Sequence, residues 1–384
     1  MTASTAGTAD PSGDEVAGGT APRRATHRAV AVLALVAVAA LIPLLGPRTA
    51  LTGTGEAAAP GADGIALLRS VLFAALCVPV GEVFASALAR RVPGASTMAA
   101  PRSWAAYAAA AGFVVALGLA SVVATGNLLP HHLSDIDIGG LYRTRDGRLA
   151  LVETDAFAAA WLCARSHRPA ARVWPPAVVA VAEALRAHPP AEHDALLGSG
   201  LTLVHLTCAA LWAGGLLHIL RLLHGRRTAT GAVTGTRETD PTGLTTTATA
   251  VGTTAATAAA AAATGPGTAA GGGRAGAALL GLYARVAAVL FATVTATGVW
   301  SALRRMPPGT VLDQLTSTAY GRALLAKVLL VAAVAVLALA ARLRLRRAAD
   351  PLGARSPARA EIVALGAVVA VSGLLTALPL PIRW

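Results

Sequence analysis

The feature that most constrains this chain is a series of apolar runs about as long as a lipid bilayer is thick. A bilayer core of ~30 Å requires about 20 mostly apolar residues in a helix. Arginines stand at the ends of these runs, and only 13% of the 384 residues are charged, against roughly a quarter in soluble domains. The sequence therefore predicts an all-α, polytopic transmembrane bundle of about seven spans. The expected spans are Ala29–Leu45, Ile65–Ala89, Ser103–Thr125, Leu201–Leu220, Ala278–Leu303, Ala323–Ala341 and Ile362–Ile382.

Two further apolar stretches are not predicted to cross the membrane. Val251–Ala263 lies inside a stretch rich in threonine, alanine and glycine, a composition that buries too little surface to order itself. Val173–Leu185 is too short to span and contains Pro175 and Pro176. It either lies on the membrane surface or is the remnant of a former crossing.

Orientation follows from the arginine bias of the flanks. With the N-terminus in the cytoplasm, the cytoplasmic segments hold most arginines near the spans, including the cluster from Arg342 to Arg359. An odd number of spans then places the C-terminus outside. The first run follows Arg23, Arg24 and Arg28 and could be a signal sequence. Because Pro60 follows the small residues after it, which disfavours cleavage, we interpret it as a retained anchor.

The expected organisation has four parts. Residues 1–28 form a disordered cytoplasmic N-terminus, and 29–126 form an N-terminal transmembrane part with three helices. Residues 127–200 form an extracytoplasmic segment. Residues 201–384 form a four-helix transmembrane module, interrupted by a low-complexity cytoplasmic linker at 228–277.

Composition and motifs exclude several classes of protein. The net charge of +13 would suit nucleic acid only if it gathered on a soluble face, whereas it lies at span ends, so we predict a lipid bilayer as partner and no nucleic acid. Three cysteines support neither a disulfide scaffold nor a multi-cysteine zinc module. No nucleophile stands beside a base, and Glu183 falls in an expected polar loop. We therefore predict that the chain is not an enzyme.

Ionisable residues inside spans are the informative ones, because each costs about 2.5–3.5 kcal/mol at the bilayer centre on insertion scales. They are Arg69, Glu82, His205, Arg285 and Lys327, with His218 and Glu361 near a span end. Helical rise puts His205 and Lys327 at similar depths near the outside, and Arg285 and Glu82 at similar depths near the cytoplasm. Arg285 is thus expected to pair with Glu82 or Glu361, as a structural lock or as a gating element.

Two groups of residues are candidate metal ligands. His205 and Cys208 are spaced i, i+3 and project from one helix face; imidazole and thiol together suit Cu(I) or Zn. Ordinary packing is the competing interpretation of this pair. His131 and His132, followed by Asp135 and Asp137, form a candidate copper or zinc site outside the membrane.

The C-terminal half resembles the copper resistance protein D (CopD) family. The carrying residues are the run from Leu201 to Leu216, with His205, Trp212 and the pair Gly214-Gly215; Tyr283-Ala284-Arg285 with Thr297-Gly298; Ala319-Tyr320-Gly321-Arg322 leading to Lys327; and Glu361 with the run to Thr376. Together these cover about residues 201–384 in the family's order.

The resemblance implies a bacterial plasma-membrane protein that transports copper or maintains copper homeostasis, commonly by uptake toward the cytoplasm. It implies His205 as the best copper contact, with Cys208, His131 and His132 assisting, and it admits an extracytoplasmic copper-binding protein as partner. Glu82, Arg285, Lys327, Glu361, Tyr320, Arg322 and Trp212 would then be structural or gating residues. A haem-binding redox protein and a non-transporting membrane scaffold or assembly factor are the alternatives.

Overall fold

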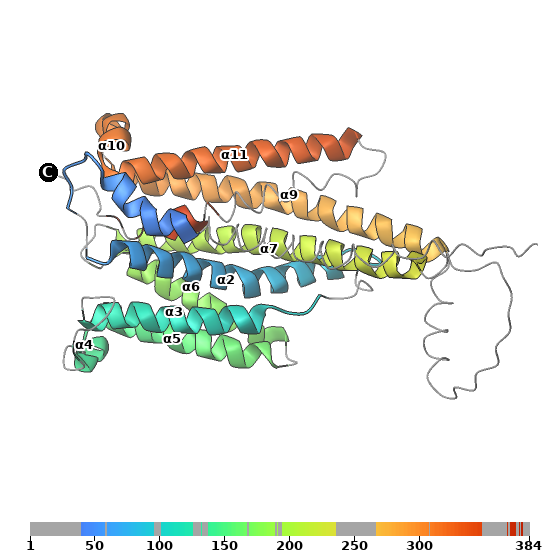
Figure 1. Cartoon of the computed structure of the whole chain (residues 1–384), viewed down its shortest axis with the longest axis horizontal. Coiled ribbons are helices and arrows are strands. Elements are labelled where there is room, and N and C mark those ends of the chain that lie inside the picture. Colours follow the sequence, from blue (N-terminus) through green and yellow to red (C-terminus); the bar gives the residue numbers. More distant parts are fainter. Residues whose placement is uncertain are drawn as a thin grey trace, which may run out of the picture.

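The computed structural model describes an elongated bundle of helices lying side by side (Figure 1). It describes residues 40–57, 60–95, 101–125, 132, 137–166, 169–188, 190, 194–235, 266–306 and 308–347, with 367, 369–373, 376 and 378 near the C-terminus. These residues contain helices and turns and no strand. The all-α fold expected from the sequence is confirmed.

Five of the described helices are long and apolar enough to cross a membrane: Ala62–Arg90, Ala105–Thr125, Ala195–Leu223, Arg274–Arg304 and Ala319–Val336. They coincide with five of the expected spans. The expected first span is described only from its end, in the shorter apolar helix Ala40–Leu51, and most of the expected last span lies outside the described residues. The total of seven therefore stays a prediction.

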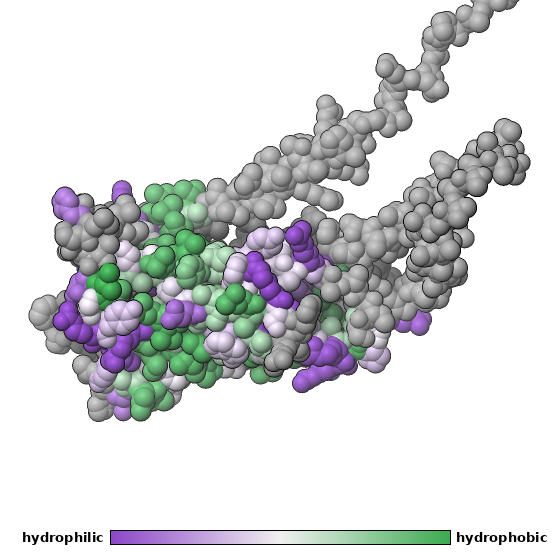
Figure 2. All heavy atoms as spheres, turned by 90° about the horizontal axis from the view of Figure 1, so that it is seen from below, coloured by the Kyte–Doolittle hydropathy of each residue, from purple (hydrophilic) through white to green (hydrophobic). Residues whose placement is uncertain are grey.

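Much of the surface of these helices is apolar. Only 17% of the most apolar window of Arg274–Arg304 is buried within the protein, and large side chains such as Val289, Leu329 and Val336 are exposed. On the face drawn in Figure 2, hydrophobic residues gather between more hydrophilic ends. Exposed apolar surface of this extent marks a membrane-contacting protein, and the chain is a multi-pass membrane protein.

The N-terminal half of the bundle is built on α2 (Ala62–Arg90) and α3 (Ala105–Thr125). Beside them lie α5 (Arg145–Ala164) and α6 (Trp174–Arg186). The short helices α4 (Ile138–Arg143) and η2 (Pro169–Arg172) connect them.

The residues between α3 and α7 are thus largely helical. The side chain of Phe157 on α5 fills the space over Gly112 of α3, where any larger residue would collide with its ring. The expectation that Glu183 sits in a polar loop is wrong, because Glu183 is buried in α6. α6 corresponds to the stretch judged too short to span, and it is not among the five candidate spans. The assignment of residues 127–200 to the outside of the membrane stays a prediction.

The second half contains α7 (Ala195–Gly235), α9 (Pro266–Arg305) and α11 (Ala319–Arg347). Turn η3 (Pro308–Thr310) and helix α10 (Val311–Ser317) lead from α9 into α11. α7 continues to Gly235 and α9 begins at Pro266, so both helices reach into the stretch 228–277 that the sequence predicts as a linker.

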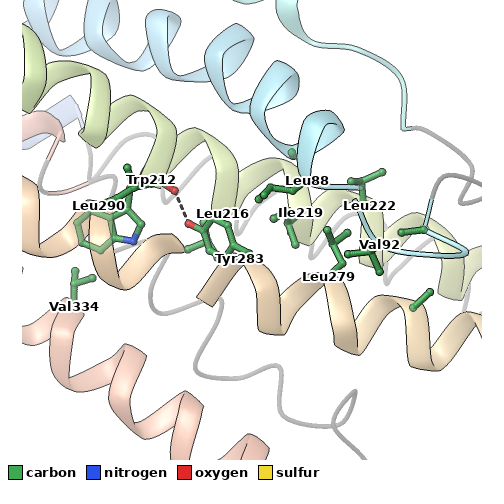
Figure 3. Packing of buried hydrophobic residues seen from close by; sticks show 13 residues of the cluster. Leu88, Val92, Trp212, Leu216, Ile219, Leu222, Leu279, Tyr283, Leu290 and Val334 are labelled. Carbon is green, nitrogen blue, oxygen red and sulfur yellow. Dashed lines mark hydrogen bonds between the residues drawn. The ribbon is translucent and has the colours of Figure 1, made fainter. Parts of the chain in front are cut away.

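One hydrophobic cluster joins α7 to α2, α9 and α11. Figure 3 shows Trp212 and Leu216 of α7 facing Tyr283 and Leu290 of α9, with Val334 of α11 beyond. A second cluster joins α2 to α3, α5 and α6. Because α2 and α7 take part in these clusters, they tie the two halves of the bundle together.

The crossing of α2 and α7 is unusually close. A Cβ atom on Gly214 would collide with the backbone oxygen of Cys77, and one on Gly81 would collide with the backbone of Gly214. Gly215 likewise faces Phe84 and Tyr283 with no room for a side chain. Small residues permit such backbone contact between membrane helices.

Candidate functional site

His205 lies in the first third of α7 and faces α9. Its Nδ1 atom is 3.0 Å from the hydroxyl oxygen of Thr297. The imidazole is therefore held by a polar side chain on the neighbouring helix and is not turned toward lipid. This contact joins α7 to α9.

The hydroxyl of Thr297 also contacts its own helix. Its oxygen is 2.8 Å from the carbonyl oxygen of Thr293 and 3.1 Å from that of Val294. When the hydroxyl donates its single hydrogen to one of these carbonyls, its oxygen accepts from Nδ1–H of His205, and Nε2 keeps the lone pair with which imidazole binds a metal.

Gly298 provides the space that the imidazole occupies. A Cβ atom at this position would lie 3.4 Å from Cε1 and 3.8 Å from Nδ1 of His205. These are contact distances, so a side chain longer than alanine would push the ring from its position. Thr297 and Gly298 together fix both the direction and the depth of the His205 side chain.

Lys327 brings a third helix to the same place. It lies on α11, close enough to His205 for its positive charge to act on the ring, and it is the only lysine in the chain. We call His205, Thr297, Gly298 and Lys327 the His205 site. A positive charge near a cation weakens its binding.

Cys208 is half-buried one turn further into α7 and packs against the hydrophobic cluster around Trp212. Its thiol is not joined to any other cysteine. Across the described ranges, no three residues among histidine, cysteine, aspartate and glutamate come together as a metal site. The His205 site therefore offers at most a few protein ligands to a metal ion.

The expected outer histidines are not brought to the His205 site by the described residues. His131 lies outside them, and His132 is exposed. A different histidine, His188, lies beside the start of α7, with its Nε2 3.0 Å from the hydroxyl oxygen of Thr202. The sequence carries no signal for this contact.

In the second half of α2, Glu82 has partners other than the expected one. Its carboxylate accepts hydrogen bonds from the Ser103 hydroxyl at 2.5 Å and the Trp104 backbone N–H at 2.6 Å. Arg221 of α7 lies 3.5 Å from the same carboxylate and stacks 3.6 Å above the Trp104 ring. Glu82 thus links α2, α3 and α7.

The expected pairing of Arg285 with Glu82 is therefore wrong. Arg285 is exposed, and its Nε donates to the carbonyl oxygen of Gly281 in its own helix at 3.4 Å. The other expected partner, Glu361, lies outside the described residues. Arg285 was expected to reach Glu82 because the two lie at similar depths along their helices, but the arginine that contacts Glu82 is Arg221 of α7.

The remaining expected residues have structural contacts. Arg322 donates from Nη1 to the carbonyl oxygen of Thr52 at 2.6 Å and from Nε to that of Thr316 at 2.8 Å. Tyr320 is buried at the start of α11. Trp212 is buried in the core, where its carbonyl accepts a 2.6 Å hydrogen bond from the Tyr283 hydroxyl (Figure 3).

Sequence reasoning missed one group of charges altogether. Arg69 of α2 forms a 2.6 Å ion pair with Glu183 of α6, and Arg186 and Glu153 lie beside it. The cost of Arg69 inside a span was the available signal, but its partner stood more than a hundred residues away in a stretch expected to be a loop.

The C-terminal part of the chain matches a known protein family. Residues 277–375 match the family model described as Copper resistance protein D. The matched segment contains Thr297, Gly298 and Lys327 and begins after His205, so it is narrower than the resemblance drawn from the sequence. No curated protein and no solved structure matches the chain.

Proposed function

We propose that this protein transports copper across the bacterial plasma membrane, toward the cytoplasm, with Nε2 of His205 as the copper contact near the outer face. The observation that carries the proposal is the contact of His205 with Thr297. This contact joins His205, the proposed copper ligand, to a residue of the segment that matches the family model described as Copper resistance protein D. The proposed orientation places the N-terminus in the cytoplasm and the C-terminus outside.

The position of His205 suits the first step of uptake. It lies about four residues into the expected span, roughly 6 Å below the outer boundary. Cys208 follows one helical turn deeper, about 4.5 Å further along the axis, and supplies a soft sulfur ligand for Cu(I). His131 and His132, which an extracytoplasmic copper-binding protein would load, collect copper before it enters.

Lys327 gives the proposed site its transient character. A positive side chain near the bound ion lowers the affinity, which a storage site would avoid and a transport site uses to release its cargo. The small number of ligands acts in the same direction. Copper therefore passes the His205 site and is not retained there.

Copper uptake into sealed vesicles tests this function. Vesicles containing the wild-type protein are expected to accumulate copper faster than vesicles without it, and the His205→Ala variant is expected to lose this difference. Thr207→Ala is the matched control, because Thr207 is exposed on the same helix two residues away. Equal uptake by the wild-type protein and His205→Ala, at equal protein level, would exclude His205 as the contact.

The same purified protein distinguishes the alternatives. A haem protein would show a haem absorption spectrum. A scaffold would show neither copper uptake nor a copper phenotype on deletion. We propose neither, because no observation on the described residues favours them over copper.

A further inference from the structure

Four charged side chains are buried together where α2, α5 and α6 meet, far along the chain from the His205 site. We call them the four-charge cluster (Arg69, Glu153, Glu183 and Arg186). Arg69 comes from α2, Glu153 from α5, and the other two from α6. Their side chains are 16%, 1%, 5% and 9% exposed, respectively. Burial this deep requires each charge to be paired or neutralised.

The two carboxyl groups of the cluster are not equivalent. Glu183 accepts hydrogen bonds from both arginines, at 2.6 Å from Nη1 of Arg69 and at 3.4 Å from Nη1 of Arg186. Glu153 has Nη2 of Arg186 at 2.8 Å from its Oε2, but the two groups are not aligned for a hydrogen bond, and neither oxygen of Glu153 accepts one. Glu153 is therefore the more deeply buried and the less well satisfied carboxyl.

The two carboxyl groups flank one guanidinium group. Nη2 of Arg186 is 2.8 Å from Oε2 of Glu153, and Nη1 of Arg186 is 3.4 Å from Oε1 of Glu183. Two carboxyl groups this close do not both ionise easily, and the shared hydrogen goes to the one with fewer donors around it. Here the donors surround Glu183.

We propose that Glu153 binds a proton at neutral pH while Glu183 stays ionised between the two guanidinium groups, which makes the four-charge cluster a proton-binding site. The proton is held on an oxygen of Glu153 and donated to the carboxylate of Glu183. This inference is independent of the copper function.

The surroundings of Glu153 support this assignment. Helix α5 is not one of the five candidate spans. Burial, and secondarily the negative charge of Glu183, raise the pKa of Glu153 to about 9, against the opposing effect of Arg186 and Arg69. The elements packed against α5 add few other charges: α3 has no charged residue, Arg143 of α4 is exposed and pairs with Asp137, and Arg172 of η2 donates to the carbonyl oxygen of Ser166.

Two matched variants test the proposal in the full-length protein. Glutamine has the shape of a protonated glutamate and needs no proton, so Glu153→Gln is expected to fold and to denature at or above the wild-type temperature at neutral pH. Glu183→Gln removes the carboxylate from between two guanidinium groups and is expected to denature at a clearly lower temperature. If Glu153 were ionised, Glu153→Gln would break its ion pair with Arg186 and denature below the wild-type temperature, and that result would overturn the proposal. A Glu153→Gln chain that fails to fold would overturn it too, as would a Glu183→Gln variant of wild-type stability.

Infrared spectroscopy of the wild-type protein provides a readout that does not depend on either variant's stability. A protonated carboxyl band is expected at neutral pH, and it should disappear on alkaline titration. The band should be missing from the spectrum of Glu153→Gln. Absence of any such band in the wild-type protein at neutral pH would contradict a proton on Glu153.

Discussion

Replacing Gly214 by alanine tests the close crossing of α2 and α7, on which the joining of the two halves of the bundle depends. The new Cβ atom would lie only 3.0 Å from Cα of Gly81 and would collide outright with the carbonyl oxygen of Cys77. Both neighbours are backbone atoms, so the clash is relieved only by moving one helix away from the other. Overpacking of this kind costs about 1–3 kcal/mol.

Gly200→Ala is the matched control on the same helix, because a Cβ atom there meets nothing within 4 Å. Removing a glycine from a helix stabilises by roughly 0.5–1 kcal/mol. Both variants make this gain, so they are expected to differ in free energy of unfolding by the overpacking cost of about 1–3 kcal/mol. Titration of the purified protein with a denaturing detergent, followed by the helical circular dichroism signal, measures this difference. Equal midpoints for Gly214→Ala and Gly200→Ala would refute the packing argument.

Three further predictions concern the polar residues. Thr297→Val removes the hydroxyl that orients His205 and is expected to weaken copper binding by about 10–100-fold, the usual effect of losing such a partner. Thr297→Ser keeps a hydroxyl and is expected to bind copper as the wild-type protein does. Isothermal titration with Cu(I) measures both affinities, and unchanged affinity in Thr297→Val would refute the role assigned to Thr297. Lys327→Met is expected to raise copper affinity about tenfold or more, because the substitution removes a positive charge that repels the bound cation, and a loss of about 1.4 kcal/mol of repulsion is tenfold in affinity; weaker binding would show that Lys327 assists the site. The folded protein holds a proton on Glu153, whereas the unfolded chain releases it above the ordinary pKa of 4.5. The stability that this proton contributes is complete below that pH and is lost as the pH rises toward about 9, by about 1.4 kcal/mol per pH unit. Denaturation temperatures should therefore fall less between pH 7 and 9 in Glu153→Gln than in the wild-type protein, and equal slopes would contradict this.

The sequence predicted the spans well because the cost of exposing backbone and polar groups to lipid leaves few alternatives to an apolar helix. It also predicted the level of His205 and Lys327, since depth follows from helical rise alone. Their convergence needed the resemblance and the structure, because rotation about each helix axis is set by packing. The same gap explains why Arg221, and not Arg285, reaches Glu82.

The four-charge cluster shows a second limit of sequence reasoning. Glu183 follows two prolines and was expected in a polar loop. Pro175 and Pro176 instead lie in the first turn of α6, where proline is tolerated. Once α6 is a helix, its contact with Arg69 depends on how α6 packs against α2. No local pattern in the sequence carries that information.

X-ray absorption spectroscopy of the copper-loaded, purified protein tests most directly whether His205 contacts copper. We predict imidazole scattering from the copper ion in the wild-type protein and its loss in His205→Ala, with Thr207→Ala unchanged. Identical imidazole scattering in His205→Ala would contradict the account, because the histidine bound to copper would then lie elsewhere in the chain.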